Sequence, residues 1–207
     1  MLIIGLTGSI GMGKSTAAAR MRALEIPVID ADAIVHKLYK AGGAAIGPIE
    51  AAFPGVTSAD GGIDRQKLAA VLLADESAYK QLEEIVHPLV FEAERAMLQA
   101  KAARGVEKAV LEVPLLFETG GDARVDVTIV VSAPAEMQCR RVIERPGMTA
   151  EKLDQILARQ MPDEEKRRRA DFVVDTSRSI PETEAQIDRI MAQLSGQIGT
   201  AFAKYWA

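Results

Sequence analysis

Short apolar runs recur along this chain and alternate with longer segments that have helical patterning. The short runs are rich in Val, Ile and Leu, a composition typical of buried strands. Five segments fit this description: Leu2–Leu6, Pro27–Asp30, Ala109–Val113, Val127–Val131 and Phe172–Asp175. Strands that alternate with helices predict an α/β fold in which a parallel five-stranded sheet has helices on both faces.

The stretch between the second and third strands is far longer than one crossover helix needs. Its patterning is helical over Ala33–Tyr39, Arg65–Ala74 and Tyr79–Ala103, with turn-forming residues between these segments. We therefore expect an inserted helical subdomain over residues 33–105. The core of a single 1–207 domain would then comprise residues 1–32, 106–138 and 171–207, with residues 139–170 left to form a separate helical segment.

Composition narrows the class of protein. The 207 residues are 48% hydrophobic, which is enough for one substantial core. With 25 basic and 29 acidic residues the net charge is −4, which argues against a general binder of nucleic acid or membrane surfaces. Cys139 is the only cysteine, so an internal disulfide is impossible and a reducing, cytoplasmic location is expected. The early first strand predicts no signal peptide, and no apolar run approaches the length of a membrane span.

Residues Gly8–Ser15 read GSIGMGKS and fit the pattern G-x-x-x-x-G-K-[ST] directly after the first strand. In such a loop the glycines let backbone N–H groups point inward, and the following helix adds positive charge at its N-terminus. Lys14 is predicted to reach the β- and γ-phosphates of a nucleotide, and Ser15 to offer its hydroxyl to Mg²⁺. A glycine-rich turn with a surface lysine is the alternative. We favour a nucleoside triphosphate site.

Two acidic residues, Asp30 and Asp32, follow the second strand. Because ligands of parallel sheets bind at the carboxyl ends of the strands, these carboxylates are expected beside the phosphate loop. One carboxylate can accept a proton from an attacking hydroxyl while another holds Mg²⁺ through water. Alternatively, either residue caps the helix that begins near Ala33.

The third strand ends in the apolar segment Pro114–Glu118, PLLFE, which is predicted to line an acceptor pocket. The alternative for Leu115, Leu116 and Phe117 is that they begin a helix and pack into the core.

Basic residues are concentrated between Arg140 and Ala170, a segment that contains nine basic and six acidic residues. Arg141 and Arg145 are four positions apart and precede Pro146-Gly147, so they share a helical face next to a hinge. Arginines on a mobile lid are suited to stabilise a migrating phosphoryl group, and residues 139–170 are predicted to form that lid. The stretch Glu164–Arg169 is expected to be a solvated helix face.

Only two histidines occur, His36 and His87, and a lone histidine is usually structural or at the surface. Two separate histidines without a cysteine pair make a transition-metal site an unfavoured interpretation.

Taken together, these motifs closely resemble those of the dephospho-coenzyme A kinase family, over almost the whole chain. The resemblance rests on LTGSIGMGKST (6–16), IDAD (29–32), GIDRQKL (62–68), HPLV (87–90), PLLFE (114–118), R-x-x-x-R (141–145), QMPDEEKRRRAD (160–171) and VVDTS (173–177). Four positions depart from the family pattern: Ser9 and Met12 replace small residues often found in this loop, Glu112 stands where many relatives carry Asp, and Thr176 where many carry Asn. Ser9 and Met12 occupy variable positions of the loop pattern, whereas the contact on the purine side stays open at Thr176.

The resemblance implies a P-loop NTPase-type fold and transfer of the γ-phosphate of ATP to the ribose 3′-hydroxyl of dephospho-coenzyme A, the last step of coenzyme A synthesis. It implies ATP and Mg²⁺ as cofactors, dephospho-coenzyme A as the small-molecule partner, and no obligatory protein partner. ATP-binding residues would be Gly8, Gly11, Met12, Gly13, Lys14, Ser15 and Thr16. Asp32 would be the base, and Arg141 and Arg145 the lid residues at the phosphates. The acceptor side would comprise Arg65, His87, Pro114, Leu115, Leu116, Phe117 and Glu118.

Two other functions remain open at this point. A nucleoside monophosphate or shikimate type of kinase would use the same loop and lid for another acceptor. A GTPase switch or a non-catalytic nucleotide-binding regulator belongs to a different class, and the chain lacks the guanine-selective N-K-x-D motif.

Overall fold

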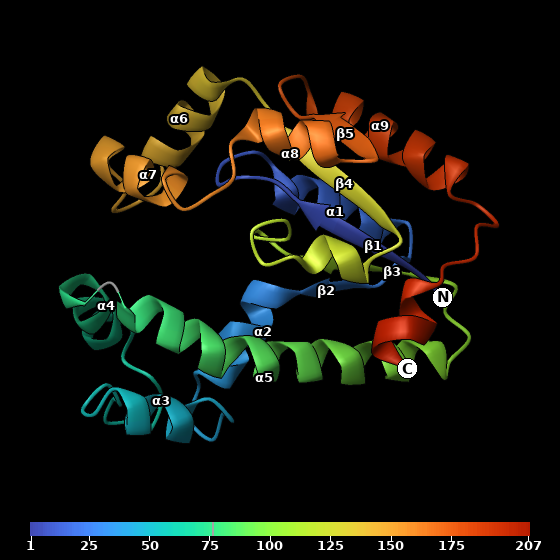
Figure 1. The fold of residues 1–207 in the computed structure, drawn as a ribbon. Coiled ribbons are helices and arrows are strands. Elements are labelled where there is room, and N and C mark those ends of the chain that lie inside the picture. Colours follow the sequence, from blue (N-terminus) through green and yellow to red (C-terminus); the bar gives the residue numbers. More distant parts are fainter. Residues whose placement is uncertain (76) are drawn as a thin grey trace. The chain divides into compact units, whose positions relative to one another are not determined.

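The protein divides into two compact units in the computed structural model, which describes residues 1–75 and 77–207 (Figure 1). The first unit comprises residues 1–29 and 99–207, and the second comprises residues 30–98. Each unit has its own hydrophobic core. Among the described residues, no helix combines the length and apolar character that a bilayer-spanning segment needs.

The first unit is built on a five-stranded sheet with the strand order β2-β3-β1-β4-β5. The strands are β1 (Leu2–Thr7), β2 (Val28–Asp30), β3 (Lys108–Glu112), β4 (Val127–Ser132) and β5 (Phe172–Asp175). The central strand β1 is parallel to both neighbours, and Ile4 is paired with Val110 on β3 and with Val127 on β4. The five predicted strands and the α/β fold class are confirmed.

The helices of the first unit are α1 (Lys14–Ala23), α6 (Ala135–Ile143), α7 (Ala150–Leu157), α8 (Asp163–Arg169) and α9 (Ile180–Gln193), with a 3₁₀ turn at Gly121–Arg124 and a π-helical turn at Phe202–Trp206. Helices α1 and α9 pack against each other. Met21 of α1 and Ile187 of α9 are fully buried in the core with Ile4 and Ile129 of the sheet. Burial of these apolar side chains fixes α1, and with it the loop that precedes α1, against the sheet.

The second unit contains α2 (Ala31–Leu38), α3 (Ile46–Ala52), α4 (Arg65–Ala74) and most of α5 (Ser77–Ala102). Ile49, Phe53 and Leu68 belong to its core. The predicted helix Arg65–Ala74 is present with the bounds expected, and the predicted helices Ala33–Tyr39 and Tyr79–Ala103 are present with ends shifted by one or two residues. Helix α3 was not predicted. Capping explains where α4 begins, because the Asp64 carboxylate accepts hydrogen bonds from the N–H groups of Gln66 and Lys67.

Candidate active site

The phosphate loop lies between β1 and α1 and is shaped by glycine conformations. Gly13 caps α1 with a φ of 91°, a left-handed conformation that favours glycine. A Cβ atom there would also lie 3.1 Å from the Thr176 side chain. The first turn of α1 contains no acidic residue, so no carboxylate competes with an incoming anion for its N–H groups.

Lys14 folds back over the phosphate loop, with its Nζ donating a hydrogen bond to the Gly8 carbonyl at 2.6 Å. Ser15 is exposed at the start of α1, and Thr16 is half-buried. The predicted lysine and hydroxyl residues are thus brought together at one loop. This arrangement can bind phosphate oxygens through backbone N–H groups and one ammonium.

The loop backbone is held by side chains that are distant in sequence. The Ile10 N–H donates to Oε1 of Gln160 at 3.1 Å, and Nε2 of Gln138 donates to the Ile10 carbonyl at 2.8 Å. The Thr176 hydroxyl donates to the Met12 carbonyl at 2.8 Å. These contacts fix the curvature of the loop before any ligand binds.

Arg141, one of the two predicted lid arginines, contacts the phosphate loop directly. Its Nη2 lies 2.6 Å from the Thr176 carbonyl, and its Nη1 lies 3.1 Å from the Thr176 hydroxyl and 3.4 Å from the Gly11 carbonyl. Arg145 is exposed beyond the end of α6, just before the Pro146-Gly147 turn that precedes α7. The structure therefore places Arg141 at the loop and Arg145 at the surface.

The segment Pro114–Glu118 follows β3 and is only partly accessible. Leu116 and Phe117 are buried, as expected for the core-packing alternative, whereas Pro114, Leu115 and Glu118 are half-buried. Direct contact between this segment and an acceptor stays a prediction.

Lys166 of α8 corrects the expectation that Glu164–Arg169 is a solvated face. Its side chain is fully buried, and its Nζ lies 2.8 Å from Oε1 of Glu118 and 3.2 Å from the Pro114 carbonyl. The correction concerns this one position, since Arg167, Arg168 and Arg169 are exposed. A buried ammonium is tolerated here because a carboxylate and a carbonyl surround it.

The second unit carries the predicted residues Asp32, Arg65 and His87. The Asp30 carboxylate accepts a hydrogen bond from the Ala33 N–H at 3.0 Å, so the helix-capping alternative is confirmed for Asp30. Asp32 is exposed in the first turn of the same helix, α2. A carboxylate in that position is available to solvent and can serve as a proton acceptor.

Arg65 and His87 lie on different helices of this unit. Nη2 of Arg65, at the start of α4, lies 3.1 Å from Nδ1 of His36, and its guanidinium carbon is 5.8 Å from the centre of the Tyr39 ring. His87 is exposed on α5, immediately before Pro88. His87 is therefore a surface histidine. The contact between His36 and Arg65 was not predicted, because no local pattern links residues 29 positions apart.

Comparison with known proteins decides the family. The family model for dephospho-CoA kinase matches residues 2–182. A dephospho-CoA kinase from Mesorhizobium japonicum is 52% identical over 200 residues, which cover 97% of this chain and 100% of the relative. The chain belongs to the dephospho-CoA kinase family.

Solved structures support the same family membership. A crystal structure from Thermus thermophilus has a TM-score of 0.79 and 37% identity, and the match covers 94% of this chain and 98% of that one. The dephospho-CoA kinase from Campylobacter jejuni has a TM-score of 0.69 and 26% identity, with 93% and 96% of the two chains covered. The P-loop kinase fold extends over nearly the whole chain.

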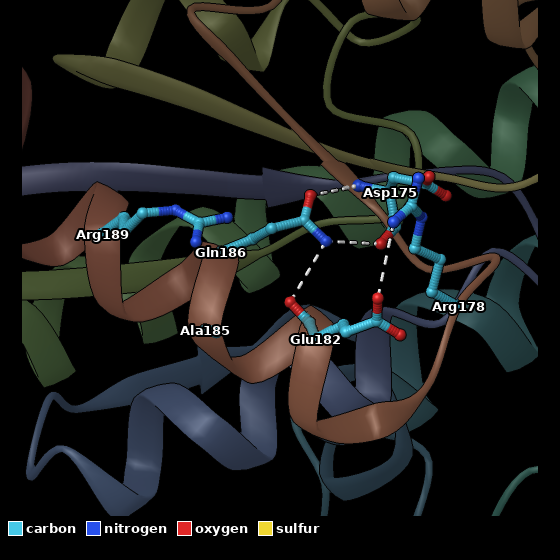
Figure 2. Close-up of a pocket in the computed structure, with 6 residues that line it drawn as sticks. All are labelled: Asp175, Arg178, Glu182, Ala185, Gln186 and Arg189. Atoms are coloured by element: carbon cyan, nitrogen blue, oxygen red, sulfur yellow. Dashed lines mark hydrogen bonds and ion pairs between the residues drawn. The ribbon is translucent and has the colours of Figure 1, made fainter.

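This family member also has a pocket of about 420 Å³ between the end of β5 and α9, lined by Asp175, Arg178, Glu182, Ala185, Gln186 and Arg189 (Figure 2). The Gln186 amide bonds both the N–H and the carbonyl of Asp175, at 2.9 and 2.8 Å. Hydrogen bonds from the hydroxyl and N–H of Ser177 lower the pKa of Asp175. None of the residues predicted to bind phosphates or acceptor lines this pocket.

Proposed function

We infer that this chain catalyses transfer of the γ-phosphate of ATP to the ribose 3′-hydroxyl of dephospho-CoA, giving coenzyme A and ADP. This is the last step of coenzyme A synthesis. The observation that carries the inference is the match of the dephospho-CoA kinase family model over residues 2–182, a range that includes the complete phosphate loop. The 52% identity to a dephospho-CoA kinase over 97% of the chain supports it.

ATP is proposed to bind at Gly8, Gly11, Met12, Gly13, Lys14, Ser15 and Thr16. The geometry supports this because Lys14 Nζ already lies against the Gly8 carbonyl, within the loop whose N–H groups would surround the phosphates. When phosphate oxygens enter, the ammonium can exchange the neutral carbonyl for a charged partner, which is a stronger interaction.

Mg²⁺ is proposed to be held by the Ser15 hydroxyl together with phosphate oxygens and water. The donor set fits this ion, because Mg²⁺ in kinase sites usually keeps several waters and takes few protein oxygens. Ser15 is the protein ligand proposed because its hydroxyl is exposed at the start of α1, at the Ser/Thr position of the phosphate-loop pattern. When bound, the ion neutralises charge on the transferring phosphoryl group.

Asp32 is proposed to be the general base. In the transfer step the ribose 3′-oxygen forms a bond to the γ-phosphorus, the bond from that phosphorus to the β,γ-bridging oxygen breaks, and the hydroxyl proton passes to the carboxylate. Exposure of Asp32 on α2 supports a role that requires access to substrate.

Arg141 and Arg145 are proposed to stabilise the migrating phosphoryl group from a lid over residues 139–170. The contact of Arg141 with the phosphate loop supports its role. Arg65, His87, Pro114, Leu115, Leu116, Phe117 and Glu118 are proposed for the acceptor side, with the helical insert 33–105 as the acceptor-binding subdomain. Cytoplasmic location and independence from a protein partner stay predictions.

A panel of acceptors tests this function. Purified protein with ATP and Mg²⁺ would be offered dephospho-CoA, AMP, adenosine and shikimate in parallel, and ADP release would be followed. We expect dephospho-CoA to have the highest kcat/KM. Faster phosphorylation of AMP or shikimate would reassign the chain to another kinase type, and binding of nucleotide with no transfer to any acceptor would favour a regulator.

A further inference from the structure

Thr176 directly follows β5 and is buried against the phosphate loop, with 4% of its surface exposed. Its N–H donates to the Ser132 carbonyl at 2.9 Å, which extends the pairing of β5 with β4 by one residue. Its side chain lies close enough to Gly13 that a Cβ atom on Gly13 would be 3.1 Å from both Cγ2 and Oγ1. The backbone therefore fixes Thr176 directly beneath the loop.

The hydroxyl of Thr176 has one proton to donate and can accept in addition. The Met12 carbonyl, at 2.8 Å, is a nearer acceptor than the Ser132 carbonyl, at 3.3 Å. Nη1 of Arg141 donates to the same hydroxyl oxygen at 3.1 Å. Arg141 thus donates a hydrogen bond to the Thr176 hydroxyl, and this hydroxyl donates in turn to the Met12 carbonyl of the phosphate loop.

Arg141 also donates from Nη2 to the Thr176 carbonyl at 2.6 Å, so this one residue accepts two hydrogen bonds from the guanidinium. Two contacts to one rigid residue fix both the position and the plane of the guanidinium. A guanidinium carries five N–H donors. The two contacts to Thr176 and the contact to the Gly11 carbonyl use three of them, which leaves two donors for phosphate oxygens.

We propose that Thr176 is a positioning residue of the nucleotide site, which holds Arg141 in the correct plane against the phosphate loop and anchors the Met12 carbonyl. The proposal rests on the function inferred above, in which Arg141 acts at the phosphates. It assigns Thr176 no direct contact with the purine, because its side chain is buried between Arg141, Gly13 and Met12.

Two substitutions separate the hydroxyl from the shape of the side chain. Thr176→Val keeps the shape and removes the hydroxyl, whereas Thr176→Ser keeps the hydroxyl and removes the methyl group. We expect Val to lower kcat/KM for ATP about tenfold and to weaken ADP binding, measured by calorimetry, by a similar factor. Ser should stay within about threefold of the wild type, and KM for dephospho-CoA should change little in both.

The same substitutions in an Arg141→Lys background show whether Thr176 acts through Arg141. We expect Thr176→Val to cost clearly less there, about threefold, because the bidentate contact of Arg141 is already lost and only the anchor of the Met12 carbonyl is removed. A tenfold loss in both backgrounds would overturn the proposal, and so would a serine variant as impaired as the valine variant. Wild-type kcat/KM and ADP affinity in Thr176→Val would overturn it as well.

Thr176→Ala is a second hydroxyl-free variant, which adds no methyl group next to the Met12 carbonyl. It should match the valine variant, and thermal unfolding would show that each variant is folded. ADP affinity tests the role of Thr176 without any acceptor. A wild type that binds ADP but does not phosphorylate dephospho-CoA would contradict the proposed function and leave the test of Thr176 intact.

Discussion

The ammonium of Lys166 lies 2.8 Å from Oε1 of Glu118, and the lysine side chain is completely buried. The same carboxylate oxygen accepts a hydrogen bond from the Met161 N–H at 2.7 Å, and Lys166 also donates to the Pro114 carbonyl. Helix α8 is thereby joined to both ends of the segment Pro114–Glu118. These contacts fix the backbone of the segment. Because the segment is proposed to contact the acceptor, the ion pair would help to shape the acceptor site.

Lys166→Met should destabilise the protein by about 3–5 kcal/mol, because it leaves the Glu118 carboxylate without its charged partner in a mostly buried place. Urea unfolding measures the change. Arg168→Met, on the exposed side of the same helix, is the matched control and should stay within about 0.5 kcal/mol of the wild type.

The double variant Glu118→Gln/Lys166→Met should recover much of the lost stability, since no buried charge then remains at the pair. A loss below about 1 kcal/mol in the single variant would show that the buried ion pair contributes little.

Lys14→Ala should lower kcat by at least about 10²-fold, because an ammonium is lost where charge builds on the bridging oxygens. Circular dichroism should show an unchanged fold, because the Lys14 ammonium bonds the Gly8 carbonyl of its own loop. Turnover equal to that of the wild type would mean that the loop does not act on the phosphates as proposed.

Asp32→Asn keeps the shape of the side chain but removes the base, so kcat should fall about 10²-fold or more while ATP binding changes little. Steady-state kinetics and ATP titration measure the two effects. Asp64→Asn, at the N-terminus of α4 in the same unit, is the control, because Asn caps helices as well as Asp. A near-normal kcat in Asp32→Asn would show that Asp32 is not the general base. Catalysis would then rest on substrate positioning and charge stabilisation alone.

Asp188 should make stability depend on pH. Its carboxylate accepts two hydrogen bonds of 2.7 Å from Arg20, which join α9 to α1 and hold the pKa of Asp188 below its usual range. A carboxyl with a lowered folded-state pKa stabilises the protein above its unfolded-state pKa and loses this effect as pH falls through the folded value.

The difference in unfolding free energy between wild type and Asp188→Asn should therefore be constant from pH 7 to 5 and shrink below about pH 4. Urea titrations at each pH measure it. A difference that grew on acidification would contradict the role given to the ion pair.

The strands and the phosphate loop were predictable because local sequence determines them. Short apolar runs such as Leu2–Leu6 suit strands buried on both faces, and the glycine pattern of the loop is tied to backbone conformation. Capping by Asp30 is likewise a local effect and was among the alternatives considered.

The side chains that hold the phosphate loop and the segment Pro114–Glu118 in place were not predictable in this way. Gln138, Gln160 and Thr176 contact the loop from 128, 150 and 164 positions away in sequence, and such pairs follow from tertiary packing. Lys166 stands in a run of charges that is typical of a solvated helix, and its burial depends on Glu118 and the Pro114 carbonyl, which lie about 50 positions away in sequence.

Identification of the product tests the central claim most directly. Wild-type protein would be incubated with ATP, Mg²⁺ and dephospho-CoA, and the product separated from authentic coenzyme A and from its isomer phosphorylated at the ribose 2′-oxygen. We predict that the product is coenzyme A itself, formed one for one with ADP. A phosphate on any other oxygen, or ADP released without coenzyme A, would contradict the account.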